Sequence, residues 1–362
     1  MPNVLQSYFP LIRTKEEILA EIHSKPDLLT VFSKWKSYQQ EDFLNFCCGN
    51  RGLKIMYDGF CKEVLNPEYD PVRLESFLTV MLKRKVKIVK VLPNDSTRIT
   101  DENSLLVTDI IVELDDGSLA NVEIQKIGYF FPGERCACYS ADMLLRQYKR
   151  ARNTYGNAFS YNQLKKVYLI VLYEKSPREF KAFPNTYFHR SETIFNSGLK
   201  LDMLQEYILI PLDIFHSCMQ NKNIETQLEA WLTFFSSDDS STIVQLITDY
   251  PEFKPMYETL YRTCLDLEKI MGFFSQELKV MDDNTVKYMV DTLSAEVDAL
   301  KQQKEALRKE KEILSKDNEI LSKDNETLSK DNETLSKDNE TLSKTNEALR
   351  QKLAELETQR AK

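Results

Sequence analysis

The chain has 362 residues, 48 of them Lys or Arg and 56 Asp or Glu, with a formal net charge of −8 at pH 7. A chain of this length can bury a sizeable core and is expected to hold more than one structural unit. Because no apolar run approaches the roughly 18 residues of a membrane span and none follows the initiating Met, we expect no membrane segment and a cytoplasmic location.

The seven cysteines are odd in number and form no CxxC pair, so we expect reduced thiols rather than disulfides. Cys136 and Cys138 have no second cysteine pair at ligand spacing, which argues against a structural zinc site. The three histidines are scattered along the chain and receive no role.

Residues 1–52 carry helical patterns and are expected to form a helical segment that packs on the main domain. Thr14 and Glu17 have the spacing of a capping box, which predicts a helix that begins just after Thr14. No chemistry is visible in this segment.

Residues 54–64 have a helical pattern, and the next helix is expected to begin at Asp70 and Pro71 and to run to about Arg84. Residues 86–92 alternate Val or Ile with Lys, which predicts a strand that Pro93 ends.

Residues 104–126 read as a hairpin, two apolar-rich runs on either side of Asp115, Asp116 and Gly117. With the turn centred on Asp116, Asp109 faces Glu123 on the neighbouring strand. Directly opposed side chains of an antiparallel pair lie on the same face, with Cβ atoms about 4.5–5.5 Å apart. Alternation adds Gln125 to that face.

Two facing carboxylates in a run this apolar repel each other and are costly to bury unpaired. A divalent cation resolves both problems, and hard oxygen ligands indicate Mg²⁺ or Mn²⁺. The alternative is a solvated sheet face that carries acidic residues by chance.

Downstream of the hairpin, residues 134–152 have a strong helical pattern, and residues 167–173 form a continuous apolar run typical of a strand buried on both faces. Residues 207–215 are expected to form a further strand, bent or at an edge because of Pro211.

The acidic net charge is unevenly distributed, because residues 51–175 carry more basic than acidic side chains. Basic side chains on the expected helix are candidates for DNA phosphate contacts: they are Arg146, Lys149, Arg150 and Arg152. An ordinary exposed polar helix face has the same composition.

Residues 222–292 are acidic and helical in pattern, and we expect an accessory helical layer there. Trp231, Phe234 and Phe235 predict an apolar cluster, while Asp239 and residues 282–284 resemble helix N-caps.

Residues 293–362 repeat leucine every seven residues, from Leu293 to Leu356, with asparagine at successive a positions from Asn318 to Asn346. Leucine at d and asparagine at a form the seam of a coiled coil, so a homodimer through this tail is expected. The central e and g positions are Ser and Asp and offer no ion pairs between helices. A long solitary helix held by pairs such as Glu319 and Lys323 is the alternative.

Asp109, the hairpin and the Glu123-x-Gln125 sequence resemble the PD-(D/E)xK nuclease superfamily, whose motif is an Asp on one strand and (Asp/Glu)-x-Lys on the next. Gln in place of Lys is similar to the family of transposases related to the recombination-promoting Rpn nucleases. Further matches to that family's signatures are Asp58, Phe60, Lys62, Arg135, Tyr139 and Gln147. The resemblance covers roughly residues 1–295 and implies an α/β, restriction-endonuclease-like αβββαβ core.

The resemblance implies that Asp109, Glu123 and Gln125 are catalytic, and that Asp109, Glu123 and the carbonyl of Ile124 hold the metal. The residues expected to support the site are Glu75, Asp58, Arg135, Tyr139 and Gln147. The alternative for Glu75 is an ordinary surface glutamate, and the alternative for Arg135 and Tyr139 is a helix that simply packs its polar edges. Gln125 departs from the usual Lys because it can orient water but brings no positive charge. Lys126 points to the opposite sheet face by alternation, so the role is not moved there.

The implied function is a metal-dependent DNA endonuclease of transposase or recombination-promoting type, which hydrolyses phosphodiester bonds. The alternative is a weakened or inactive nuclease scaffold that acts as a coiled-coil interaction protein. The expected organisation is a helical segment at 1–52, a nuclease-like core at 53–221, an acidic helical region at 222–292 and a coiled coil at 293–362.

Overall fold

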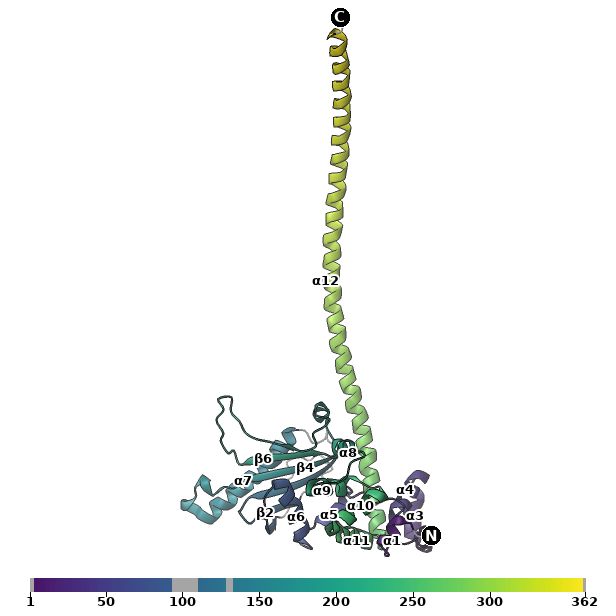
Figure 1. Ribbon diagram of the computed structural model, residues 1–362, viewed down its shortest axis with the longest axis vertical. Coiled ribbons are helices and arrows are strands. Elements are labelled where there is room, and N and C mark those ends of the chain that lie inside the picture. Colours follow the sequence, from purple (N-terminus) through teal and green to yellow (C-terminus); the bar gives the residue numbers. More distant parts are fainter. Residues whose placement is uncertain (1–2, 93–109, 128–132, 361–362) are drawn as a thin grey trace. The chain divides into compact units, whose positions relative to one another are not determined.

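The structure is a computed structural model that describes residues 3–92, 110–127 and 133–360. It divides into two compact units, Met1–Asn284 and Thr285–Lys362 (Figure 1). The three segments expected before residue 293 thus fall almost entirely within the first unit.

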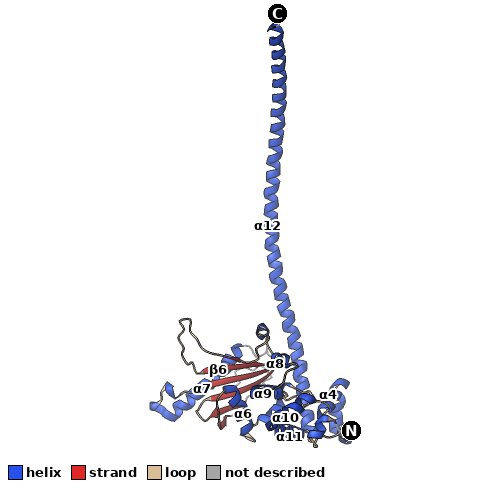
Figure 2. Ribbon diagram, viewed as in Figure 1, coloured by secondary structure: helices blue, strands red, loops and turns tan. Residues whose placement is uncertain are grey.

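A mixed sheet forms the centre of the first unit (Figure 2). Its described strands, in spatial order, are β1 (Ile88–Leu92), β2 (Ile110–Leu114), β3 (Leu119–Ile127), β4 (Val167–Lys175), β6 (Gln205–Pro211) and β5 (His189–Arg190). The first three strands form an antiparallel meander, β4 and β6 run parallel to β3, and β5 is antiparallel to β6. The predicted α/β fold class is confirmed.

The β2–β3 hairpin has the predicted register. Ile110 is opposite Val122 and Val112 is opposite Ala120, which is the pairing that a turn centred on Asp116 requires. Gly117 has φ +81, a left-handed conformation that glycine adopts without the steric cost of a side chain. Residues 104–109, the first part of the expected hairpin, lie outside the described residues, and β2 is described from Ile110 onward.

The sheet separates two hydrophobic clusters, because alternate residues of each strand point to opposite faces. Val122, Ile124 and Ile170 belong to the larger cluster, which most of the helices share. Val171 belongs to the smaller cluster, which is covered by α7 (Gly133–Tyr155), the helix predicted at 134–152. β4 is buried on both faces, as its apolar run predicts.

The N-terminal helices are α1 (Val4–Tyr8), α2 (Lys15–Ser24), α3 (Pro26–Lys34) and α4 (Ser37–Cys47). The predicted capping box is present: Thr14 Oγ1 accepts from Glu17 N at 3.2 Å, and Glu17 Oε2 accepts from Thr14 N at 2.8 Å. This box sets where α2 begins.

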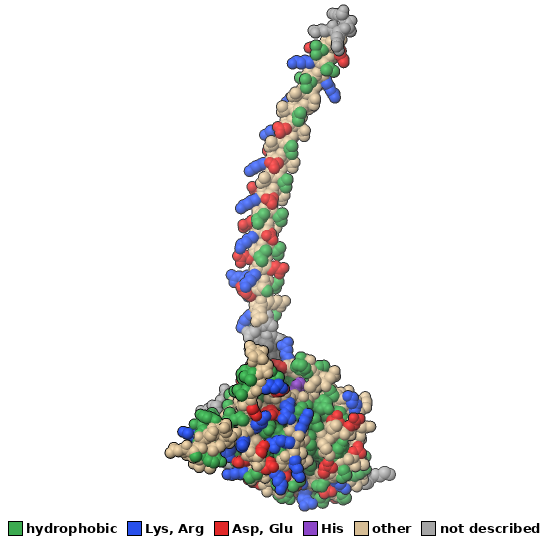
Figure 3. Space-filling model, turned by 60° about the vertical axis from the view of Figure 1, so that its left-hand side comes forward, with side chains coloured by type: hydrophobic (Ala, Val, Ile, Leu, Met, Phe, Trp, Pro, Cys, Tyr) green, Lys and Arg blue, Asp and Glu red, His purple; other side chains and the backbone are tan. Residues whose placement is uncertain are grey.

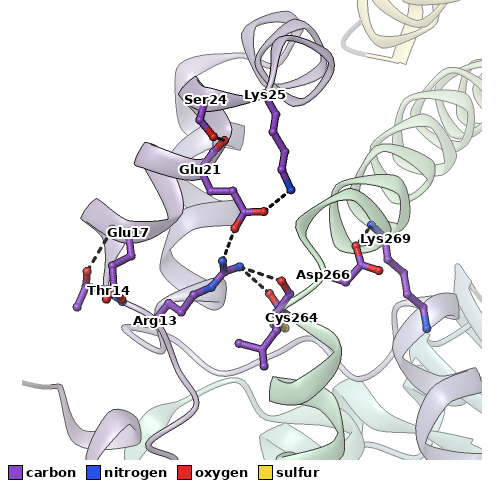
Figure 4. Close-up of polar contacts among 10 residues, drawn as sticks. Arg13, Thr14, Glu17, Glu21, Ser24, Lys25, Cys264, Asp266 and Lys269 are labelled. Atoms are coloured by element: carbon purple, nitrogen blue, oxygen red, sulfur yellow. Dashed lines mark hydrogen bonds and ion pairs between the residues drawn. The ribbon is translucent and has the colours of Figure 1, made fainter.

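Arg13 ties the N-terminal helices to the rest of the first unit (Figure 4). Its guanidinium pairs with Glu21 of α2 and donates to the carbonyl oxygen of Cys264 at 3.2 Å. Lys25 pairs with the other oxygen of Glu21 at 2.7 Å. The segment 1–52 is therefore part of one packed unit rather than a separate body.

The next two helices are α5 (Asp58–Leu65) and α6 (Pro71–Leu82). The helix predicted from residue 54 begins instead at Asp58, because residues 54–57 form a turn in which Tyr57 N donates to Lys54 O at 3.0 Å. Asp70 caps α6 as predicted, and Lys83 ends it in a left-handed conformation with φ 54.

The strand predicted at 207–215 is wrong beyond its middle. β6 ends at Pro211, and α8 (Leu212–Met219) follows directly. Proline has no N–H to donate to the ladder, and the apolar residues that follow it bury one face of a helix.

The remaining helices are α9 (Gln227–Ser236), α10 (Ser240–Asp249), α11 (Lys254–Thr263) and α12 (Leu267–Arg360), and short 3₁₀ helices lie at Gly156–Ala158, Tyr161–Gln163, Arg178–Ala182 and Pro251–Phe253. Trp231 packs against Phe234 and Phe235, as the aromatic pattern predicts, and also against Phe77. Asp239 caps α10, but the cap predicted at 282–284 is wrong because α12 continues through it.

The second unit consists of the rest of α12. Its heptad leucines from Leu293 to Leu356 are 57–62% exposed, so the single helix leaves the apolar seam uncovered; Figure 3 shows these hydrophobic side chains recurring along it. Glu312 pairs with Lys316 at 3.2 Å and Glu340 with Lys344 at 3.5 Å, which gives the helix the predicted i,i+4 support.

Candidate functional site

Strand β3 carries a polar stripe on the face that α7 covers. Asn121, Glu123 and Gln125 alternate with apolar residues, and they are 1%, 1% and 8% exposed. Leu119, two residues before Asn121 on the same strand, belongs to the smaller cluster, whereas Ile124 belongs to the larger one. Polar residues this deeply buried need partners, so the stripe is the strongest candidate for a functional site.

Asn121 and Glu123 contact each other directly. The Asn121 amide Nδ2 donates to Glu123 Oε1 at 2.7 Å. Asn121 Oδ1 is also buried, and it accepts no hydrogen bond from any described residue. A buried acceptor left without a donor costs about 1–3 kcal/mol, which marks this oxygen as one that a ligand or water would satisfy.

Tyr173 and Cys136 border the stripe. Tyr173 on β4 is the direct neighbour of Gln125 in the parallel register, and its hydroxyl lies 3.9 Å from Cys136 Sγ on α7. Burial raises the pKa of Cys136 to about 11, and the negative charge of Glu123 adds to the rise. Burial likewise raises the pKa of Tyr173 far above its usual value, with further contributions from Cys136 and Glu123. Both groups are therefore protonated and neutral at pH 7.

Asp109, the predicted partner of Glu123, lies outside the described residues. It directly precedes Ile110, the first described residue of β2, which is opposite Val122. Within the ranges that the structure describes, no group of three or more His, Cys, Asp or Glu side chains is placed to hold a metal. The pairing of Asp109 with Glu123 stays a prediction.

Arg135 and Tyr139 share one face of α7, as their spacing predicts. Arg135 Nη2 donates to the Tyr139 hydroxyl at 3.0 Å, and the guanidinium lies 5.4 Å from the centre of the Tyr139 ring. Cys136, the residue after Arg135, contacts Tyr173, so this end of α7 lies near the polar stripe.

Gln147, also predicted to support the site, is placed at the other end of α7. Its side-chain amide nitrogen Nε2 donates to Gly117 O at 3.3 Å, and its Oε1 accepts from Lys165 N at 2.7 Å. These contacts join the hairpin turn to the residues before β4. The structure therefore gives Gln147 a bracing position and does not bring it to Glu123.

Glu75 is likewise not brought to the stripe. Its carboxylate accepts from the backbone N of Ile88 at 2.8 Å, and Ile88 is opposite Leu114 beside the hairpin turn. The adjacent residue of α6, Leu74, belongs to the larger cluster, on the other side of the sheet from Glu123.

Asp58 lies with Lys126 on the face of β3 opposite the stripe. Glu277 of α12 joins them, because it accepts from Asp58 N at 3.0 Å and forms a buried ion pair with Lys126. Lys62 pairs with Asp58 at 2.6 Å, and Lys126 Nζ lies 4.2 Å from the Tyr57 ring centre. Lys126 thus faces away from Gln125, as alternation predicts.

The predicted DNA-binding side chains lie along the second half of α7 and are partly engaged within the protein. Arg146 pairs with Asp142 at 2.7 Å and Arg150 with Glu113 at 3.3 Å, while Arg152 lies 5.3 Å from the ring centre of Phe159. Lys149 is exposed. Figure 3 shows Lys and Arg gathered on one face of the first unit, with Asp and Glu among them.

Sequence reasoning missed Asn121 and Tyr173. For Asn121 a signal was present, since polar residues at every second position of a buried strand mark one face. For Tyr173 none was, because its place beside Gln125 depends on the register between β3 and β4.

The mixed sheet of six described strands, with its surrounding helices, is consistent with a PD-(D/E)XK nuclease fold. The family described as PD-(D/E)XK nuclease family transposase matches residues 59–291, well over half of the chain, and the chain belongs to this family. Family membership indicates a nuclease that acts on DNA, in a class that generally depends on divalent metal.

Comparisons with curated proteins and with solved structures found no match. Among the residues described, no helix is long and apolar enough to cross a membrane.

Proposed function

We propose that this protein is a Mg²⁺- or Mn²⁺-dependent DNA endonuclease of the transposase or recombination-promoting type, acting in the cytoplasm. The observation that supports it most is the buried Glu123 carboxylate, flanked on the same face of β3 by Asn121 and Gln125. A buried carboxylate among amides, beside a helix with an Arg and a Tyr, suits phosphodiester hydrolysis better than it suits packing.

Asp109, Glu123 and the backbone carbonyl of Ile124 would hold the cation. The donor set fits, because carboxylate, carbonyl and amide oxygens are the ligands that Mg²⁺ and Mn²⁺ prefer. When bound, such a cation lowers the pKa of water and offsets the charge of the scissile phosphate.

Gln125 would orient the attacking water through its amide, since it stands at the position where the superfamily has Lys. Lys126 does not replace that Lys, because it pairs with Glu277 on the opposite face of β3. Gln125→Lys restores the missing charge, and we expect it to preserve or increase the cleavage rate.

Arg135 and Tyr139 would contact a phosphate of the substrate. Their mutual hydrogen bond holds the guanidinium on one face of α7, and a preset guanidinium loses less entropy on binding. Lys149, Arg150 and neighbouring basic residues would follow the DNA backbone further along the helix.

Incubation of the purified protein with supercoiled plasmid tests the proposal. We expect relaxation or linearisation with Mg²⁺ or Mn²⁺ and none with EDTA. Asp109→Asn and Glu123→Gln should each reduce cleavage about 100-fold or more, the loss typical of removing one group that stabilises charge in the transition state. Glu206→Gln is the matched control, a buried carboxylate of β6 that pairs with Arg190.

Metal-independent cleavage, or equal cleavage by wild type and Glu123→Gln, would contradict the proposal. The second candidate is a nuclease scaffold that binds partners without cleaving DNA. The charge missing at Gln125 favours it, and it predicts DNA or protein binding that is indifferent to EDTA.

The tail would pair with a second copy of the chain. Its leucines are more than half exposed on the single helix, and burying such a seam is what drives coiled-coil association. Asp occupies the central g positions, such as Asp317 and Asp324. These aspartates would face one another in an antiparallel pair but face serine in a parallel one, so the parallel arrangement is favoured.

A further inference from the structure

We infer that Asn121 is a positioning residue of the same site: it holds the Glu123 carboxylate toward a divalent cation and adds a second hard oxygen beside it. This inference rests on the proposed nuclease function. It goes beyond that function because Asn121 lies outside the Asp and Glu-x-Gln positions of the motif.

The contact is built into the strand. Asn121 and Glu123 are two residues apart on β3, so both side chains stand on the face toward α7, and each is 1% exposed. The 2.7 Å bond from Asn121 Nδ2 to Glu123 Oε1 fixes one carboxylate oxygen. An ionised carboxylate has about four acceptor positions, so a bond to one of its oxygens is compatible with a cation on the other.

An amide is the suitable donor for this purpose. A Lys or Arg at the same position would orient the carboxylate but would also bring a positive charge that opposes cation binding. The buried Glu206 of β6 shows that other arrangement, since it pairs with Arg190 and with Lys166. Asn121 gives Glu123 a hydrogen bond that carries no net charge.

The oxygen of the Asn121 amide provides a second, independent observation. Asn121 Oδ1 is buried beside Glu123 and accepts from no donor in the ranges that the structure covers. A divalent cation, or a water molecule held by one, is a partner that an amide oxygen satisfies well. The unsatisfied oxygen and the oriented carboxylate belong to the same side-chain pair.

Thermal melting of the full chain against Mn²⁺ concentration tests the role without relying on cleavage. Asn121→Ala removes the donor and the oxygen, and we expect it to raise the Mn²⁺ concentration at half-maximal stabilisation by about 10–100-fold, as for other residues that orient metal ligands. Val122→Ala is the matched control: it shortens the neighbouring buried side chain on the opposite face and should leave that midpoint unchanged.

Asn121→Asp is the second variant, because it keeps the shape of the side chain even if Asn121→Ala does not fold. It places a second carboxylate against Glu123, so it should melt below wild type in EDTA and gain more from saturating Mn²⁺. The inference would be overturned, and the proposed function left standing, if Asn121→Ala had the Mn²⁺ midpoint of wild type and Asn121→Asp melted like wild type in EDTA. A wild type that Mn²⁺ does not stabilise would overturn the metal site and, with it, this inference.

Discussion

Removing one partner of the buried ion pair between Lys126 of β3 and Glu277 of α12 should lower the free energy of unfolding by a large amount. The two side chains are only 8% and 3% exposed, and the Lys126 ammonium also lies 4.2 Å from the ring centre of Tyr57. Lys126→Met keeps most of the volume of the side chain but removes its charge. The Glu277 carboxylate then stays buried, with its bond from Asp58 N but without its cation.

Removing one partner of a buried ion pair typically costs about 3–5 kcal/mol, because the other charge is left uncompensated. In a domain of more than 150 residues, each kcal/mol lowers the melting temperature by about 2–4 °C, which gives roughly 6–20 °C here. Replacing both partners, Lys126→Met with Glu277→Gln, should cost less than the sum of the two single changes by about 1–3 kcal/mol.

Calorimetry or circular dichroism of the four proteins measures this cycle. Lys200→Met is the control, since it breaks a solvent-exposed pair with Glu192 and should leave the melting temperature unchanged. If Lys126→Met melts within a degree or two of Lys200→Met, or if the two single changes add without coupling, the reasoning from burial fails.

Three further outcomes are expected. Gly117→Ala should destabilise the first unit by about 1–2 kcal/mol in urea unfolding, because φ +81 is costly for a residue with a side chain; no change would mean that the turn relaxes. Arg146→Gln with Arg150→Gln should weaken DNA binding and lower the slope of log K against log salt by up to about two, whereas an unchanged slope would assign both to their contacts with Asp142 and Glu113. Truncation after residue 296 should leave a folded unit that light scattering finds as one chain, whereas the full-length protein should have the mass of two chains. The same number of chains in both proteins would rule out the tail dimer.

The hairpin was predictable because two local signals agree. A turn with glycine at its left-handed position and apolar-rich runs on both sides favour one register that buries the apolar side chains. The observed pairing of Ile110 with Val122 is that register. α7 and β4 were predictable from one signal each, the helical pattern of residues 134–152 and the continuous apolar run of residues 167–173.

Where a segment was mispredicted, the local pattern permitted two structures. The apolar residues around Pro211 suit a strand or a buried helix, and proline divides them between β6 and α8. The polar residues 282–284 suit an N-cap, but a cap forms only where the backbone leaves the helix. In α12 the helix-forming residues on both sides continue through them.

The supporting residues of the site were the least predictable, because a polar side chain in sequence does not reveal which distant backbone group it satisfies. Glu75 caps the N–H of Ile88, and Gln147 bridges Gly117 and Lys165. Asn121 was missed because the family motif marks the acidic residue Glu123 but not the neutral amide two residues before it.

The repeated tail can change in length without changing its sequence pattern. Each seven-residue unit adds about 10 Å to an α-helix and returns leucine and asparagine to the same side. Twenty-one nucleotides gained or lost during replication therefore alter the length of α12 in fixed steps, without shifting the reading frame or the seam. Only the non-repeated ends, such as Val297 and Leu353, distinguish one alignment of two tails from another seven residues away. Homologues that differ in the number of repeats would thus have helices of different lengths with the same leucine and asparagine seam.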